Sequence, residues 1–166
     1  MALIDGMLQE LEEEARTTRR VLERVPENKL AWRPHPKARP LGELALHVAI
    51  VPGAIAELVA SQSTAQAPDF TYPSPKSASE LIPALEHSIA TAKKLLGGMD
   101  DAALMATWRL MRGERELFAL PRVALLRSIM LNHWYHHRGQ LTVYLRELEV
   151  PIPSIYGPSA DENPFA

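Results

Sequence analysis

PRVALLRSIMLNHWYHHRGQLTVYLREL, residues 121–148, is the stretch that decides the fold. Steps of three, four, four and three residues join its inward-facing positions Met130, His133, His137, Leu141 and Tyr144. Side chains at this spacing form one stripe along a helix, and such a stripe packs into a helical core. We therefore predict a long helix over residues 121–148 that carries two histidines on its buried face.

A second stripe of the same kind contains another histidine. Steps of three, four, three and four residues join Leu44, His47, Val51, Ala54 and Leu58. The predicted helix starts near Pro40, because proline suits a first helical turn, and runs to about Ser61. Pro52 and Gly53 should bend it about one turn beyond His47.

The rest of the chain predicts two more helices, over residues 3–24 and 79–96, because the same periodicity recurs there. Residues 61–76 read as a loop, and residues 99–120 as a short helical turn followed by an irregular crossing segment. The proline-rich tail, residues 150–166, should be non-helical and lie across the surface. Since no stretch shows sustained alternation with a period of two, residues 1–166 predict a single all-α domain, a four-helix bundle.

Composition narrows the function. With 18 Lys and Arg against 20 Asp and Glu, the chain lacks the strong positive field that attracts nucleic acid or an anionic membrane. It contains no cysteine, so a metal would be held by nitrogen and oxygen, and thiol chemistry would need a thiol from outside. The first residues do not have the basic-then-apolar order of a secretory signal, which predicts a cytoplasmic protein.

His47, His133 and His137 are the candidate metal ligands. A buried imidazole without a partner costs on the order of 1–3 kcal/mol, so three rings directed into one interior require a shared partner. Two histidines four residues apart present their rings from the same side of a helix, and a third from a facing helix completes a triangular set of donors. The zinc-peptidase motif is excluded because Trp134, and not glutamate, follows His133.

Other residues near these stripes have weaker assignments. We expect His136 to hydrogen-bond near the site, His35 and His87 to lie on the surface, and Glu43 to be either an acceptor for an imidazole N–H or a solvated first-turn glutamate. Gly139 lowers helix propensity, and close approach of another backbone is the expected reason. Gln140 and Tyr156 are candidate substrate contacts, the latter in a tail that would cover the mouth of the site.

Two stretches resemble a known family. NHWYHHRGQLTVYLRELEVPIPSIYGPSADE, residues 132–162, together with LGELALHVA, residues 41–49, is similar to the DinB and YfiT-like metalloproteins. The resemblance covers essentially the whole chain. It implies a four-helix bundle in up-down-down-up order, a homodimer, and one divalent ion held by His47, His133 and His137. This chain departs from many relatives in having Asn132 before the histidine pair and Trp134-Tyr135 within it.

Characterised members of that family include transferases and isomerases that use a low-molecular-weight thiol such as bacillithiol, mycothiol or glutathione. The first functional hypothesis is therefore a metal-dependent thiol S-transferase with zinc or nickel, iron and manganese being alternatives. The second is a hydrolase that uses metal-bound water, and the third is a noncatalytic stress-response protein with a structural metal or none. No nucleic-acid or membrane partner is expected.

Overall fold

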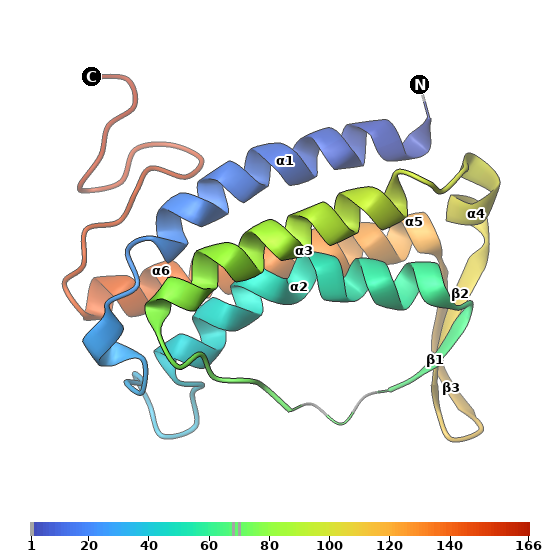
Figure 1. Ribbon diagram of the computed structural model, residues 1–166, viewed down its shortest axis with the longest axis horizontal. Coiled ribbons are helices and arrows are strands. Elements are labelled where there is room, and N and C mark those ends of the chain that lie inside the picture. Colours follow the sequence, from blue (N-terminus) through green and yellow to red (C-terminus); the bar gives the residue numbers. More distant parts are fainter. Residues whose placement is uncertain (1, 68, 70) are drawn as a thin grey trace.

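The computed structural model describes residues 2–67, 69 and 71–166, and it is mostly helical (Figure 1). Three long helices are α1 (Leu3–Leu22), α2 (Leu41–Ser61) and α3 (Leu81–Leu96). A fourth rod combines α5 (Arg122–Leu125), the π-helical segment η3 (Leu126–Asn132) and α6 (His133–Glu147). The shorter helices are α4 (Asp101–Met105) and the 3₁₀ turns η1 (Glu27–Lys29) and η2 (Ala78–Glu80).

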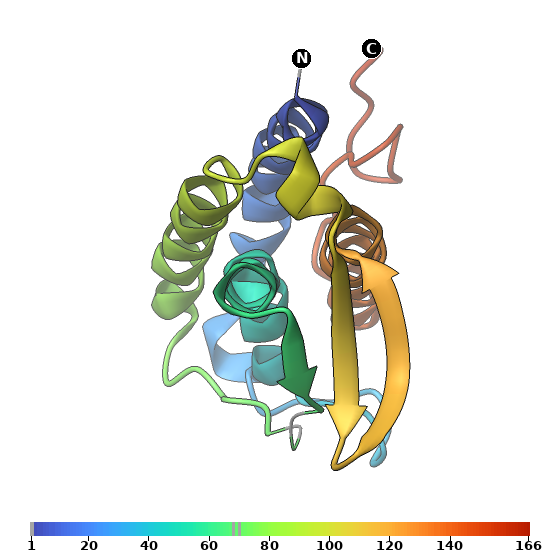
Figure 2. The ribbon, with the colours of Figure 1, turned by 90° about the vertical axis from the view of Figure 1, so that its right-hand side faces the viewer.

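A small sheet at one end of the molecule corrects the all-α prediction. Its strands are β1 (Thr64–Gln66), β2 (Thr107–Arg112) and β3 (Arg115–Pro121), in the order β1-β2-β3. β1 runs parallel to β2, and β2 runs antiparallel to β3 (Figure 2). The four-helix bundle expected from the sequence is therefore too simple a description of this fold.

The hairpin occupies most of the segment expected to be irregular. Gly113, at φ 60°, starts the two-residue loop between β2 and β3, a conformation that glycine adopts without strain. Gln66 joins β1 to this loop, because its side chain accepts a hydrogen bond from the Gly113 N–H at 3.0 Å. The expected short helical turn is confirmed as α4.

α2 is the central helix of the fold, with α3 on one side and the α5–α6 rod on the other (Figure 2). By length and composition α2 could cross a membrane, with a mean hydropathy of 1.8. Half of that window is buried inside the protein, however, as expected for a core helix. Its fully buried residues are Leu41, Ala45, Val48, Ala49, Ala56 and Val59.

Pro52 lies inside α2, and the helix is bent along its length (Figure 1). Proline has no N–H, so the carbonyl of Val48 loses the donor that it would have in a regular helix. The indole N–H of Trp134, on α6, donates to that carbonyl at 2.7 Å. Trp134 is completely buried. This hydrogen bond fixes the position of α6 against α2, one residue away from His47 and from His133.

The close helix approach expected at Gly139 is found at Gly53 instead. A Cβ at Gly53 would lie 2.9 Å from the Cα of Ser88, so glycine allows α2 and α3 to approach here. The Gly53 N–H also donates to the Ser88 hydroxyl at 2.8 Å. A Cβ at Gly139 would meet no atom within 4 Å in the described part of the chain, so the prediction of a close backbone approach at Gly139 was wrong.

We predict that Gly139→Ala stabilises the protein by about 0.5–1 kcal/mol, because alanine has the higher helix propensity and the added methyl group has room. Gly53→Ala, the matched control, should destabilise the protein because its methyl group would meet the backbone of Ser88. Urea unfolding measures both changes. Destabilisation by Gly139→Ala would contradict the open environment of this glycine.

We further predict that Trp134→Phe lowers the free energy of unfolding by about 1–3 kcal/mol, because it leaves the buried Val48 carbonyl without a donor. Pro52→Ala restores a backbone N–H at the position that can serve this carbonyl. The double variant should therefore lose less stability than the two single losses combined, as a double-mutant cycle from urea unfolding would reveal. Strict additivity would argue against the coupling.

Candidate metal centre

Three imidazoles from two helices converge at one point, as the sequence predicts. His47 comes from α2, and His133 and His137 come from α6. The ring centroids lie 4.6 Å apart for His47 and His137, 5.2 Å for His47 and His133, and 4.4 Å for His133 and His137. Each ring offers one nitrogen such that the three nitrogens lie within 4.8 Å of one another.

The local backbone explains how α6 presents its pair. The two histidines occupy positions i and i+4, so both rings project from the same face. The π-helical η3 ends at Asn132, directly before His133. π-helical turns are frequent at functional sites. The sequence predicted one continuous helix here and did not reveal the π-helical turns.

The outer nitrogens of the α6 pair are held by acceptors. Nδ1 of His133 lies 3.2 Å from the Ile129 carbonyl, and Nδ1 of His137 lies 2.7 Å from Oε1 of Gln140. Because both oxygens only accept, each Nδ1 carries the proton and each Nε2 presents a lone pair. The two Nε2 atoms are 2.7 Å apart. Two facing lone pairs at this distance repel each other, and a cation between them would remove the repulsion.

His47 supplies the third donor. Its Nε2 is buried and has no hydrogen-bond partner among the described residues. A buried polar atom without a partner is costly and rare, so its presence beside two other imidazole lone pairs requires an explanation. A divalent ion that accepts nitrogen ligands fits all three donors.

The electrostatics of the centre keep the rings neutral. Burial lowers the pKa of His47 to about 3 and that of His137 to about 4, with smaller contributions from neighbouring histidines and Arg39. Burial also lowers the pKa of His133. At neutral pH the imidazoles are therefore uncharged, which is the form that binds a metal.

Two residues that the sequence analysis did not single out complete the surroundings. The ring of Tyr72 stands edge-on to His47, with centroids 5.8 Å apart, and Cζ of Arg39 lies 3.4 Å from the centroid of the Tyr72 ring. Both residues belong to loops, where no periodicity marks a side chain as inward-facing. Proximity in three dimensions is the signal that identifies them.

The other candidates have different surroundings. Gln140 contacts His137, whereas the hydroxyl of Tyr156 bonds to Arg138 and Glu14, on the side of α6 that faces α1. Their roles as substrate contacts stay predictions. Glu43 accepts from the Ser74 hydroxyl at 3.1 Å and from no imidazole in the described structure. His35, His87 and His136 are exposed, which confirms the surface prediction for the first two.

The C-terminal tail is anchored elsewhere than expected. Glu162 pairs with Arg20 and Arg24, beside the end of α1, and Asp161 pairs with Arg146 near the end of α6. Figure 1 shows the tail at this end of the molecule. The side chain that lies against the imidazoles comes instead from Tyr72, in the loop between β1 and η2.

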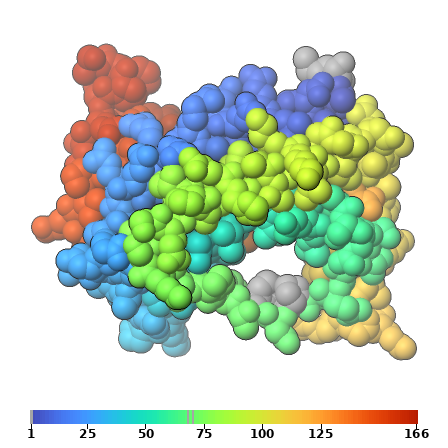
Figure 3. All heavy atoms as spheres, in the orientation of Figure 1, coloured from blue at the N-terminus to red at the C-terminus, as the bar shows by residue number. Residues whose placement is uncertain are grey.

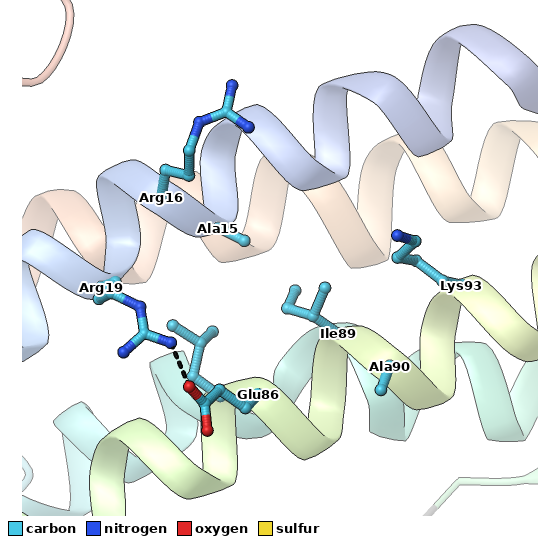
Figure 4. A pocket seen from close by; sticks show the side chains of 8 residues that line it. Ala15, Arg16, Arg19, Glu86, Ile89, Ala90 and Lys93 are labelled. Atoms are coloured by element: carbon cyan, nitrogen blue, oxygen red, sulfur yellow. Dashed lines mark hydrogen bonds and ion pairs between the residues drawn. The ribbon is translucent and has the colours of Figure 1, made fainter.

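A separate groove of about 320 Å³ lies between α1 and α3, which run next to each other along one face (Figures 3 and 4). Leu85 and Ile89 are among its lining residues, and Arg19 pairs with Glu86 at 2.5 Å. The groove contains no histidine, and its polar groups do not converge on a common point (Figure 4). We therefore assign the candidate functional site to the three imidazoles.

Known proteins resemble the chain over nearly its full length. It is 29% identical over 160 residues to the uncharacterized protein YrdA of Bacillus subtilis (strain 168). The aligned region covers 96% of this chain and 91% of YrdA. The crystal structure of a DinB-like protein from Bacillus cereus ATCC 10987 superposes with a TM-score of 0.71 at 25% identity, covering 92% of this chain and 97% of the other.

A second crystal structure, of a member of the DinB family from Exiguobacterium sibiricum 255-15, gives a TM-score of 0.59 at 23% identity and covers 89% of this chain and 95% of the other. This likeness concerns the fold. The family model of the DinB family itself matches residues 2–163. This chain therefore belongs to the DinB family.

Proposed function

We propose that the protein is a metal-dependent enzyme of the thiol S-transferase type, in which His47, His133 and His137 hold one zinc or nickel ion. The observation that carries this proposal is the buried Nε2 of His47, which lacks a partner and lies beside two further imidazole lone pairs. When bound, the ion would favour loss of the proton from an external thiol to water. The thiolate would then form a carbon–sulfur bond with an electrophilic substrate, whose leaving group, chloride for a chloro-nitroaromatic, departs with the electron pair of the broken bond.

The protein's own groups prepare this centre. The Ile129 carbonyl and Gln140 orient two rings, and burial keeps all three imidazoles uncharged. Three protein donors leave at least one coordination position for an incoming molecule, as in catalytic rather than structural metal sites. Because the chain has no cysteine, the sulfur must come from a separate molecule.

The hydrolase alternative has less support. It requires a general base close to the centre, and Glu43, the nearest candidate along α2, is engaged by Ser74. A cytoplasmic location and a homodimer also belong to this proposal, on the strength of the sequence and the family.

We predict that protein purified without a histidine tag contains about one divalent ion per chain and conjugates a low-molecular-weight thiol to a chloro-nitroaromatic electrophile. Chelation should abolish this activity. His137→Ala should lower metal affinity by at least about ten- to a hundredfold, because loss of a mere hydrogen-bond partner of a metal ligand already has an effect of that size. The activity should fall together with the metal content. Metal analysis and thiol consumption measure these outcomes.

His87→Ala is the matched control, because His87 is exposed on α3. This variant should keep full metal content and activity. Activity that survives both chelation and His137→Ala would contradict the proposal. Full metal occupancy without turnover of any thiol, combined with a sharp loss of thermal stability on chelation, would instead support a structural metal.

We also predict that the metal-free protein becomes less stable as the pH falls below about 6.5. The ordinary pKa of histidine is 6.5, whereas the folded protein holds His47 at about 3 and His137 at about 4. Between about pH 4 and 6.5 the unfolded chain therefore binds more protons, so stability is fully present above pH 6.5 and is lost as the pH falls. Urea unfolding at several pH values should show this slope.

His47→Asn should flatten the slope, because the variant lacks one of the depressed groups, whereas His87→Ala should leave it unchanged. A metal-free protein whose stability is constant over this pH range would contradict neutral imidazoles in the folded state.

A further inference from the structure

Arg39 occupies an unusual position for a charged side chain. It lies two residues before α2 and is half-buried, with its guanidinium stacked on the face of Tyr72. Its Nη1 atom is buried and has no hydrogen-bond partner among the described residues. A guanidinium carries five N–H donors and a permanent positive charge, so a buried donor without an acceptor indicates that an acceptor is to be supplied.

The other half-buried or buried arginines in the described part of the chain have acceptors. Arg138, which is 1% exposed, pairs with Glu14 at 2.6 Å, and Arg19 pairs with Glu86. Arg122 donates to the backbone carbonyls of Val59, Gln62 and Ala103. None of the ion pairs found in the described part of the chain includes Arg39. Arg39 thus differs from the other half-buried or buried arginines in having a buried donor without an acceptor among the described residues.

Arg39 also belongs to the histidine centre. The ring of Tyr72 contacts Arg39 with its face and stands edge-on to His47, so a single aromatic ring connects the guanidinium to the first imidazole. A molecule bound at the imidazoles is therefore within the electrostatic reach of this guanidinium.

We propose that Arg39 binds a carboxylate of the molecule that enters the histidine centre, so that the co-substrate is a small thiol that carries a carboxylate. This inference rests on the proposed function and names the class of its substrate. A guanidinium offers parallel N–H donors that match the two oxygens of a carboxylate, and such pairs are strong where water is partly excluded. Tyr72 would hold the guanidinium in place for this contact.

The test compares two thiols of similar shape, mercaptopropionate and its methyl ester, which lacks the negative charge and carries one extra methyl group. Each is titrated into the cobalt-substituted protein, where the absorption band of sulfur bound to cobalt reports occupancy. We expect wild-type protein to bind the acid about ten- to hundredfold more tightly than the ester, the value of a hydrogen bond to a charged group. Arg39→Gln should abolish this preference while cobalt content stays unchanged.

Arg16→Gln is the matched control, since it removes the same charge from an exposed arginine that lines the groove between α1 and α3. It should keep the full preference for the acid. Arg39→Lys retains the charge without the paired donors and should give an intermediate preference. Equal binding of acid and ester by wild-type protein, or an undiminished preference in Arg39→Gln, counts against a carboxylate on the thiol.

A second experiment tests whether the carboxylate that Arg39 binds belongs to the electrophile and not to the thiol. Iodoacetate and iodoacetamide also differ in charge, and an Arg39-dependent difference in KM between them would support carboxylate binding by Arg39 with the electrophile as its source. If neither pair shows a preference that depends on Arg39, the proposal is overturned.

A third arm does not depend on the metal. Thermal stabilisation of the metal-free protein by mercaptopropionate, but not by its ester, should disappear in Arg39→Gln. If the protein holds no ion, the proposed function fails, but this experiment still decides whether Arg39 recognises a carboxylate. If the acid does not stabilise the metal-free wild-type protein, carboxylate binding by Arg39 is overturned.

Discussion

The hydrogen bond from the Trp134 indole to the Val48 carbonyl is the constraint on which the candidate centre depends. Pro52 leaves that carbonyl without a helical donor, and Trp134 supplies one from the neighbouring rod. His47 directly precedes the acceptor residue, and His133 directly precedes the donor residue. This buried contact therefore links α2 to α6 at the level of the three imidazoles. Pro52, which interrupts the hydrogen bonding of α2, thereby helps to align His47 with the histidines of α6.

α6 carries two polar clusters that are buried in different ways, one with uncharged side chains and the other with an ion pair. Toward α2, the imidazoles are kept uncharged by desolvation, and their Nε2 lone pairs face one another. Toward α1, Arg138 is charged and almost fully buried, and Glu14, Thr18 and Tyr156 satisfy it. The second cluster has all its partners and holds the C-terminal tail through Tyr156, whereas the first lacks a partner. This difference separates a structural polar cluster from one suited to bind a ligand.

The sequence predicted what is local and missed what is not. Helical periodicity located the long helices and the three histidines, because spacing along one chain segment determines which side chains share a face. The hairpin was missed because the alternation is short and irregular, with only Trp108 fully buried, and because β1 joins it across more than forty residues. Arg39 and Tyr72 were missed for the same reason, since their contact joins two loops. Gly139 was misread because a propensity cost does not specify what compensates it.

The π-helical turns of η3 have a consequence for how such a centre can arise or be lost. In an α-helix each residue turns the rod by roughly 100°, so the insertion or removal of one amino acid upstream swings every downstream side chain around the axis. A π-helical stretch absorbs an added residue without breaking the rod. Loss of one codon within Leu126–Asn132 would therefore be taken up by these turns, which would become α-helical, and the α6 ring pair would still face α2. In this fold the ability to chelate is encoded by helix phase as much as by the presence of histidine.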